Sequence, residues 1–258
     1  MKAPFLLLSS FLIALPALAG EAFVPFVTSD PGGVDSGRST GAGLELYNRG
    51  SVARHYTVRF VPAGAAGPAA GVLVEAGTLA PGSFASVSCC ESGRISGVLV
   101  VSGAPQIAVA ADLFEMFNHP GPNGVLARLP VLTAQDAVPA GGSALLQRLT
   151  WASNGVVTSS LGIFNLGSRP ARCAVSGFGD SAASFSDLRS FVVPAGSTAA
   201  FPDVLGQRIG TQGFTSFTVR PAVTCDQPFY PFAVQYAGNV GGILPSVEVV
   251  PPSVMLGR

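Results

Sequence analysis

Apolar and polar residues alternate in two stretches of the chain, residues 52–62 (VARHYTVRFVP) and 169–179 (RPARCAVSGFG). Apolar residues stand two positions apart at Val58 and Phe60 in the first stretch, and at Ala171, Cys173 and Val175 in the second. A period of two places such side chains on one face of an extended strand, whereas a helix repeats about every 3.6 residues. Both stretches are therefore predicted to be half-buried β-strands.

The segments just before these strands are near copies of each other: LELYNRGS at residues 44–51 and LGIFNLGS at residues 161–168. In each copy two alternating apolar residues are followed by the sequence Asn-x-Gly-Ser. Asn and Gly are typical turn residues, Gly because its backbone accepts conformations that other residues avoid. We predict a strand-turn-strand corner in each copy, opened by Asn48 and Asn165, with the final serine as a local hydrogen-bonding residue rather than a nucleophile.

Three further matches follow in the same order along the chain. Residues 79–87 (LAPGSFASV) resemble 193–201 (VPAGSTAAF), 95–103 (ISGVLVVSG) resemble 214–222 (FTSFTVRPA), and 105–113 (PQIAVAADL) resemble 231–238 (PFAVQYAG). Similar segments in constant order indicate an internal duplication. Short strands at spacings of about 8–12 residues, separated by Gly and Pro, favour a β-sandwich in each copy.

The boundaries of the two copies follow from a third repeated signal. Residues 23–28 (FVPFVT), 128–133 (RLPVLT) and 243–249 (ILPSVEV) are interpreted as one strand type that begins the first copy, separates the copies and closes the second. The chain is thus predicted to be all-β, with two tandem immunoglobulin-like antiparallel β-sandwich domains at residues 21–133 and 134–258, a common domain size. The last residues, VPPSVMLGR, are interpreted as a loose tail.

Residues 1–20 (MKAPFLLLSSFLIALPALAG) have the pattern of a secretory signal peptide. Lys2 precedes an apolar run, and Ala17 and Ala19 supply the small residues of a cleavage site. We expect cleavage after Ala19 or Gly20 and export to the periplasm, the cell surface or the medium. No later stretch is long and apolar enough to predict a membrane span.

The composition excludes some partners. Charged residues make up 11% of the chain and the formal net charge is zero, which gives no electrostatic footprint for nucleic acid or for an anionic membrane. With 32 Gly and 21 Pro the chain has many turn residues, but 48% hydrophobic residues are enough to form a buried core. No cofactor is expected.

The four cysteines of an exported chain are predicted to form disulfides. Cys173 and Cys225 lie in two expected strands of the second copy, and we predict a bridge between them across the sandwich. Cys89 and Cys90 are adjacent, which leaves three alternatives open: a vicinal disulfide between them, a reduced and buried pair, or a link to another chain. They lack the Cys-x-x-Cys spacing of a redox pair.

The strand, Asn-x-Gly turn and strand, followed by Ala-Pro-Gly-Ser or Pro-Ala-Gly-Ser before another strand, resembles bacterial immunoglobulin-like modules. The nearest patterns are those of CARDB, DUF11 and ASH-type domains. The resemblance covers both halves of the predicted mature chain and implies the sandwich fold. It also implies a role as a spacer, adhesive unit or docking piece of a secreted protein, and no catalytic residue comes with it.

Residues suited to catalysis do not form a convincing set. The two histidines, His55 and His119, have no second histidine at metal-ligand spacing. Ser181 in GFGDSA lacks the glycine that follows the nucleophile of trypsin-like proteases. Asp112 and Glu115 are the best carboxylate pair, but a separation of three residues puts them on opposite faces of a strand.

Two weaker candidates concern binding. Asp30 and Asp35 lie in TSDPGGVDSG, where two carboxylates among glycines would begin a calcium site or simply form a turn. Trp151 is the only Trp, and together with Tyr230 and Tyr236 it would hold a sugar if the three rings shared an exposed face.

We therefore expect a secreted, non-enzymatic structural or adhesive protein of the bacterial envelope or surface that acts by protein contact. The alternative is a carbohydrate- or ligand-binding module that uses the aromatic residues of the second domain. A third class, an unrecognised hydrolase, would require a pocket that gathers Asp112, Glu115 or His119. Sequence does not identify the partner or the oligomeric state.

Overall fold

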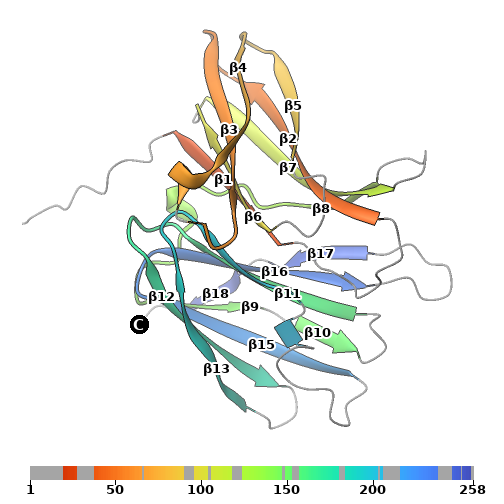
Figure 1. Cartoon of the computed structure of the whole chain (residues 1–258), viewed down its shortest axis with the longest axis vertical. Helices are drawn as coiled ribbons and strands as arrows, with labels where there is room; N and C mark the ends of the chain where they lie inside the picture. The colour runs from red at the N-terminus through yellow and green to blue at the C-terminus, as the bar shows by residue number, and fades with distance from the viewer. Residues whose placement is uncertain are drawn as a thin grey trace, which may run out of the picture.

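The computed structural model of this chain consists of antiparallel β-strands, which confirms the all-β prediction. It describes residues 20–27, 38–65, 67–89, 96–103, 106–117, 124–146, 149–152, 157–179, 184–202, 204–205, 216–237, 246–250 and 252–256. Within these residues the strands form four sheets, two in each half of the chain (Figure 1). The predicted signal peptide lies outside the described residues, apart from Gly20.

The N-terminal half contains two four-stranded sheets. Sheet 1 has the order β5 (Phe84–Cys89), β2 (Arg38–Asn48), β7 (Ile107–Phe117) and β8 (Gly124–Arg128). Sheet 2 has the order β1 (Glu21–Phe26), β6 (Gly97–Ser102), β3 (Arg54–Pro62) and β4 (Val72–Leu79). A short 3₁₀ turn, η1 (Pro68–Ala70), lies between β3 and β4.

The C-terminal half repeats this arrangement. Sheet 3 has the order β14 (Thr198–Phe201), β11 (Val157–Asn165), β16 (Phe229–Ala237) and β17 (Ser246–Val250). Sheet 4 has the order β13 (Ser184–Val193), β12 (Ala171–Gly179), β15 (Ser216–Cys225), β9 (Ser143–Leu146) and β18 (Pro252–Leu256), and β10 (Leu149–Ala152) also pairs with β15. Sheet 3 therefore corresponds to sheet 1 strand for strand, and sheet 4 corresponds to sheet 2 with β18 added.

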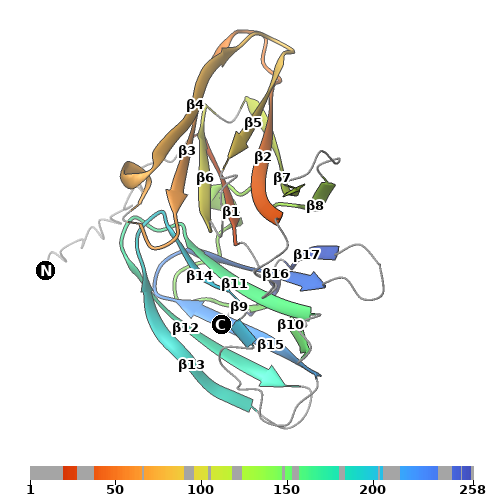
Figure 2. The same cartoon turned by 45° about the vertical axis from the view of Figure 1, so that its right-hand side comes forward.

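Three buried apolar clusters lie between sheets 1 and 2, sheets 2 and 3, and sheets 3 and 4, and β8 of sheet 1 also lies beside β17 of sheet 3 (Figures 1 and 2). Sheets 1 and 2 enclose the first cluster, and sheets 3 and 4 enclose the second. The third cluster joins sheet 2 to sheet 3 and contains Phe23, Val27, Val61, Val98, Val100, Leu132, Phe164, Leu166, Tyr230, Phe232 and Val234. The two halves thus share a continuous apolar layer.

Some strands of the two middle sheets are buried on both faces, because each sheet packs on its own half and on the other half. All but the last residue of β6 are buried, and so are all but the first residue of β11. Continuous apolar runs such as VLVV in β6 are the expected sequence of such strands. The alternation predicted for β3 is observed, with Tyr56, Val58 and Phe60 buried.

The segment between the halves is tied down at both ends. Phe23 and Leu132 exchange backbone hydrogen bonds of 2.8 Å, and Val138 and Phe229 exchange bonds of 2.8 and 3.0 Å. Between them Thr133 caps the 3₁₀ turn η2 (Ala134–Asp136), whose Asp136 accepts a 2.7 Å bond from the Thr133 backbone. The joint is therefore part of the packed structure.

The strand pairing corrects part of the predicted repeat. The predicted match of residues 79–87 with 193–201 is confirmed. Phe84 pairs with Tyr47, and Thr198 pairs with Phe164, the counterpart of Tyr47. The predicted match of residues 95–103 with 214–222 was wrong, because it equates Val101 with Arg220. In the structure Val101 pairs with Val58, and Val175, the counterpart of Val58, pairs with Val223. Val101 therefore corresponds to Val223. An offset of three residues, being odd, places the side chains on the wrong face of the strand.

The match of residues 105–113 was also displaced. Val109 pairs with Leu46, and Pro231 pairs with Ile163, the counterpart of Leu46 in the second copy. Pro231 therefore corresponds to Val109 and not to Pro105. This offset is even, and the faces are preserved.

The third repeated signal was misread as one strand type. Phe23 in β1 pairs with Leu132 as a partner, so FVPFVT and RLPVLT are neighbours rather than copies. The ILPSVEV segment supplies β17, the counterpart of β8. The predicted loose tail contains β18, which pairs with β9.

Each Asn-x-Gly corner is held by a buried asparagine side chain. Asn48 Nδ2 donates to the carbonyl oxygens of Val52 and Leu79 at 2.9 Å, and its Oδ1 accepts from the Gly50 backbone at 2.9 Å. Asn48 also exchanges backbone hydrogen bonds with the turn between β4 and β5, at Ser83 and Gly82.

The second corner reproduces these bonds. Asn165 Nδ2 donates to the carbonyls of Arg169 at 2.8 Å and Val193 at 3.0 Å, and Oδ1 accepts from Gly167 at 2.8 Å. Both asparagines are fully buried, whereas Ser51 and Ser168 are exposed. The asparagine, not the serine, is the hydrogen-bonding residue of the corner.

The corner glycines are required by space and not by backbone conformation. Neither Gly50 nor Gly167 has a positive φ. A Cβ on Gly167 would lie 3.0 Å from Asn165 Oδ1 and 2.9 Å from Gln227 Cβ, and a Cβ on Gly50 would lie 3.2 Å from Asn48 Oδ1. The expectation that glycine serves the turn through its conformational freedom is corrected accordingly.

The predicted bridge between Cys173 and Cys225 is present. It joins directly opposed residues of β12 and β15, with a Cα–Cα distance of 4.1 Å. Both strands belong to sheet 4, so the bridge connects neighbours within one sheet instead of crossing the sandwich as predicted. Cys89 is buried at the end of β5 and is disulfide-bonded, which rules out the alternative that it stays reduced. Cys90 lies outside the described residues, so the vicinal bridge itself stays a prediction.

The corner predicts a strong dependence of stability on Asn165. Asn165→Ala leaves three buried or half-buried carbonyls without their donor, so we expect the free energy of unfolding in urea to fall by about 3 kcal/mol. Arg169→Ala is the control, because that exposed residue contributes only its backbone carbonyl and should change the free energy by less than about 0.5 kcal/mol. Equal effects of the two substitutions would contradict this role of Asn165.

Candidate functional site

Of the residues considered for catalysis, the two whose side chains the structure describes, His55 and Asp112, lie on different sheets. His55 on β3 is exposed, with Nδ1 2.7 Å from Thr78 Oγ1. Asp112 on β7 belongs to sheet 1 and lies 3.0 Å from Nε of Arg128 on β8. His119, Ser181, Asp30 and Asp35 lie outside the described residues, as does the side chain of Glu115. Within the described part of the chain, no three His, Cys, Asp or Glu side chains are grouped to hold a metal ion.

The aromatic residues proposed for a sugar site do not share an exposed face. Trp151 is 5% exposed and packs in the cluster between sheets 3 and 4. Tyr230 is 8% exposed and packs in the layer between sheets 2 and 3. Tyr236 lies in β16 opposite Thr158, and its side chain lies outside the described residues. Trp151 and Tyr230 thus serve packing in this structure.

The outward face of sheet 1 exposes several large apolar side chains. Phe84 on β5 is 75% exposed, its pairing partner Tyr47 on β2 is 45% exposed, and Val125 on β8 is 67% exposed. Glu45 and the half-buried Phe114 lie on the same face, since their strand neighbours point into the core. Phe84 and Tyr47 are cross-strand neighbours at one end of the sheet, whereas Val125 lies opposite Phe114 at the other end. Exposed large apolar side chains of this kind are typical of a contact site.

The counterpart of this face in sheet 3 is covered by sheet 2 at its described central positions. Tyr47 corresponds to Phe164 and Ala110 corresponds to Phe232, according to the strand pairing. Phe164 and Phe232 are fully buried against sheet 2, and the Phe164 ring centroid lies 5.2 Å from that of Phe23. Thr198, the counterpart of Phe84, accepts a 2.9 Å backbone hydrogen bond from Gly64.

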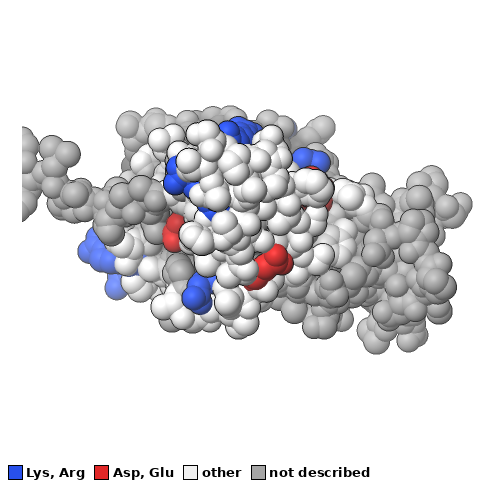
Figure 3. Space-filling view, turned by 90° about the horizontal axis from the view of Figure 1, so that it is seen from above, with Lys and Arg blue, Asp and Glu red and all other residues white. Residues whose placement is uncertain are grey.

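Sheet 4 forms the other end of the stack, and its outward face carries basic residues. Arg172 on β12 and Arg220 on β15 are exposed, as is Thr224, because their strand neighbours point into the core. Charged residues are few elsewhere: Figure 3 looks down on the N-terminal half and shows them scattered among neutral atoms. This view shows no basic patch of the kind that binds nucleic acid.

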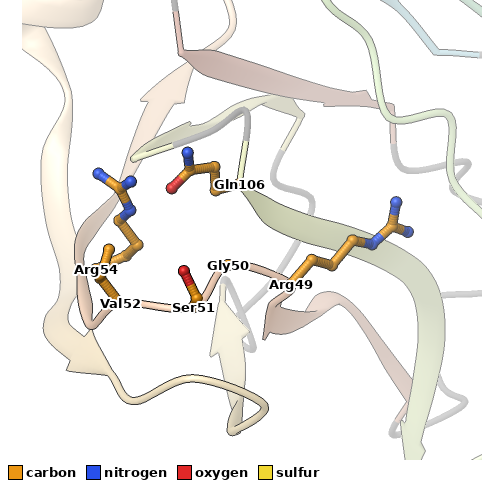
Figure 4. Close-up of a pocket in the computed structure, with 6 residues that line it drawn as sticks. All are labelled: Arg49, Gly50, Ser51, Val52, Arg54 and Gln106. Atoms are coloured by element: carbon orange, nitrogen blue, oxygen red, sulfur yellow. The ribbon is translucent and has the colours of Figure 1, made fainter.

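A pocket lies beside the first Asn-x-Gly corner. It encloses a cavity of about 310 Å³ lined by Arg49, Gly50, Ser51, Val52, Arg54 and Gln106. Arg54, Ser51 and Gln106 point toward one another across the cavity, whereas the Arg49 side chain extends away (Figure 4). Nε of Arg54 is buried and has no hydrogen-bond partner among the residues that the structure describes.

Neither the pocket nor the sheet 1 face was found by sequence reasoning. The available signal was the difference between the copies: Tyr47 stands where the second copy has Phe164, and Arg54 stands where it has Ala171. Such differences become informative only when the correct register is known.

No family model matches this chain, and no curated protein matches it. The likeness to immunoglobulin-like modules therefore remains a resemblance in short motifs. No helix within the described residues is long and apolar enough to cross a membrane. The Cys173–Cys225 disulfide is consistent with an oxidising compartment.

The buried position of Tyr230 predicts a loss of stability at alkaline pH. Burial, and secondly the charge of Asp136, raise the pKa of Tyr230 above its ordinary value of 10.0. The folded state thus favours the protonated phenol, and this contribution to stability is complete below pH 10 and is lost as the pH rises through the folded-state pKa. Urea unfolding from pH 8 to pH 11 should therefore show a fall above about pH 10 that Tyr230→Phe reduces.

Tyr47→Phe is the matched control, since it removes an exposed hydroxyl, and it should leave the fall in place. The burial argument would be refuted by a Tyr230→Phe variant whose pH profile coincides with that of the unsubstituted protein.

Proposed function

We propose that the chain is an exported, non-enzymatic structural protein of two tandem immunoglobulin-like β-sandwich domains, residues 21–133 and 134–258. It acts by protein contact at an envelope or cell surface, and its partner is a second copy of itself. The outward face of sheet 1 in one copy stacks on the outward face of sheet 4 in the next. The duplicated sheet order, the signal-like N-terminus and the disulfide support the architectural part of this proposal.

One observation carries the choice of contact surface. The exposed face of sheet 1 corresponds strand for strand to the face of sheet 3 that is buried against sheet 2. Phe84, Tyr47 and Val125 remain exposed at that position. Covering them would remove apolar surface from water, and roughly 25 cal/mol is gained for each Å² buried.

The same correspondence selects the partner face. Within the chain, sheet 3 docks on the outward face of sheet 2, and sheet 4 is the counterpart of sheet 2. A contact of sheet 1 with sheet 4 of the next copy would be equivalent to the contact of sheet 3 with sheet 2 inside one chain. Each copy would then contact one neighbour through sheet 1 and another through sheet 4. Head-to-tail contacts of this kind produce rings or open filaments.

Charged residues lie on both end faces. Sheet 1 presents Glu45 on β2 and Arg128 on β8, which is paired with Asp112, and sheet 4 presents Arg172 and Arg220, with Asp226 beside Arg172. The proposed contact places Glu45 of sheet 1 against the arginines of sheet 4. Opposite charges across an interface favour the correct register and disfavour like-charged alternatives.

The distribution of reactive side chains is in keeping with a contact role. His55 lies on sheet 2 with Thr78 as its partner, and Asp112 lies on sheet 1 with Arg128 as its partner. Each of these two side chains has a neighbour on the adjacent strand of its own sheet.

The stacking is tested by sedimentation equilibrium of the mature chain over a range of concentrations. We expect the average mass to rise with concentration, and the double substitution Phe84→Ser with Tyr47→Ser to weaken the association roughly tenfold or more. Val72→Ser is the matched control, because Val72 is 65% exposed on β4, away from both end faces, and its loss should have no effect. A protein that stays monomeric at all concentrations would refute the proposal.

Charge reversal distinguishes head-to-tail stacking from face-to-face dimers. Glu45→Arg and Arg220→Glu should each weaken self-association, and an equimolar mixture of the two variants should restore it. If Glu45→Arg strengthens association, or if the mixture fails to recover, the sheet 1 to sheet 4 contact is wrong. Circular dichroism and thermal unfolding of each variant show that the fold is retained.

A further inference from the structure

The corner pocket has residues that the shared architecture does not require. The second corner keeps the asparagine and glycine, but it has Leu166, Arg169 and Ala171 where the first has Arg49, Val52 and Arg54. The hydrogen bonds of Asn48 are reproduced by Asn165 without any of these side chains. Arg54 is therefore not needed to build the corner.

Arg54 also has an unsatisfied donor. Its Nε is buried, and no hydrogen-bond acceptor reaches it within the described part of the chain. Leaving a buried donor without a partner destabilises the protein, and more so when the donor belongs to a charged group. Such a group at the wall of a cavity indicates that an acceptor from outside the protein completes it.

The neighbouring side chains are suited to the same acceptor. Ser51 offers a hydroxyl and Gln106 offers a carboxamide, and both point toward Arg54 across the cavity (Figure 4). Gly50 lacks a Cβ, which leaves room beside Gln106 Oε1. The cavity of about 310 Å³ has space for a small group and its hydration.

We propose that this pocket binds a single carboxylate group of a small ligand. The Arg54 guanidinium contributes one positive charge to the cavity, since Arg49 extends away from it, and one charge matches a monoanion better than a phosphate dianion. The planar fork of a guanidinium pairs with the two oxygens of a carboxylate. Ser51 donates an additional hydrogen bond, and Gln106 donates one through Nε2 once its carboxamide is turned over, since Oε1 faces the cavity (Figure 4). The site is independent of the stacking faces, so either proposal can fail without the other.

The experiment follows the side-chain Nε–H resonances of the arginines by ¹⁵N NMR during titration of the mature chain with sodium acetate, with sodium chloride at equal ionic strength as the reference. We expect a saturable shift of the Arg54 resonance with acetate, and at most a small, unsaturable shift with chloride. Sodium sulfate should shift it less than acetate at equal concentration. N-acetylglycine and glucuronate then test whether the carboxylate of a peptide or that of a sugar acid binds more tightly.

Variants connect the shift to the pocket. Arg54→Lys retains the charge but removes the Nε–H and the fork, and Arg54→Gln removes the charge as well. Acetate binding, followed through backbone amides of residues 49–52, should weaken about tenfold or more in both variants. Arg169→Gln, at the second corner, is the matched control and should bind acetate normally.

Three results would overturn the proposal. These are a chloride response equal to that of acetate, an Arg54→Lys variant that binds acetate as well as the unsubstituted protein, and an equal acetate response at Arg169. Thermal unfolding of Arg54→Lys provides the check on folding. A variant that folds normally and loses the acetate response supports the site.

Discussion

The apolar layer between sheets 2 and 3 is the contact on which the rest of the structure depends. Phe23 and Phe164 meet in this layer, and Phe232 packs directly over Gly162, where a Cβ would collide with the ring. Because each middle sheet also covers the core of its own half, its central strands β6 and β11 are buried almost throughout. This double burial joins the two halves, while the β3–β4 side of sheet 2 stays exposed at His55 and Val72.

The two asparagine corners explain how the same architecture is built twice. Each places a carboxamide where backbone donors and acceptors would otherwise be buried without partners, which is costly in a dry interior. Specific roles are to be found where the copies differ. Tyr47 and Phe84 are exposed where Phe164 and Thr198 are buried, and Arg54 lines a pocket where the second copy has Ala171. The repeated motif builds the fold, and the proposed binding surfaces lie at positions where the two copies have different residues.

Sequence reasoning succeeded where the signal is local. The all-β class, the Asn-x-Gly corners, the match of residues 79–87 with 193–201 and the pairing of Cys173 with Cys225 follow from periodicity, turn residues and spacing. It failed where strands are apolar throughout, because a continuous run such as VLVV gives no register. Val101 was therefore matched to Arg220 instead of Val223. The sheet 1 face and the pocket could not be predicted without that register.

The amino-acid sequence by itself determined the strands, the corners and the duplication, because these depend on the alternation of side chains and on short-range hydrogen bonds. Only the tertiary structure decided which sheet faces are covered. The same position is fully buried as Phe164 and half exposed as Tyr47, since sheet 2 packs on one copy and nothing in the described chain packs on the other. Whether the second face of a sheet is buried depends on which other sheet packs against it. The alternation of residues within one strand does not specify that sheet.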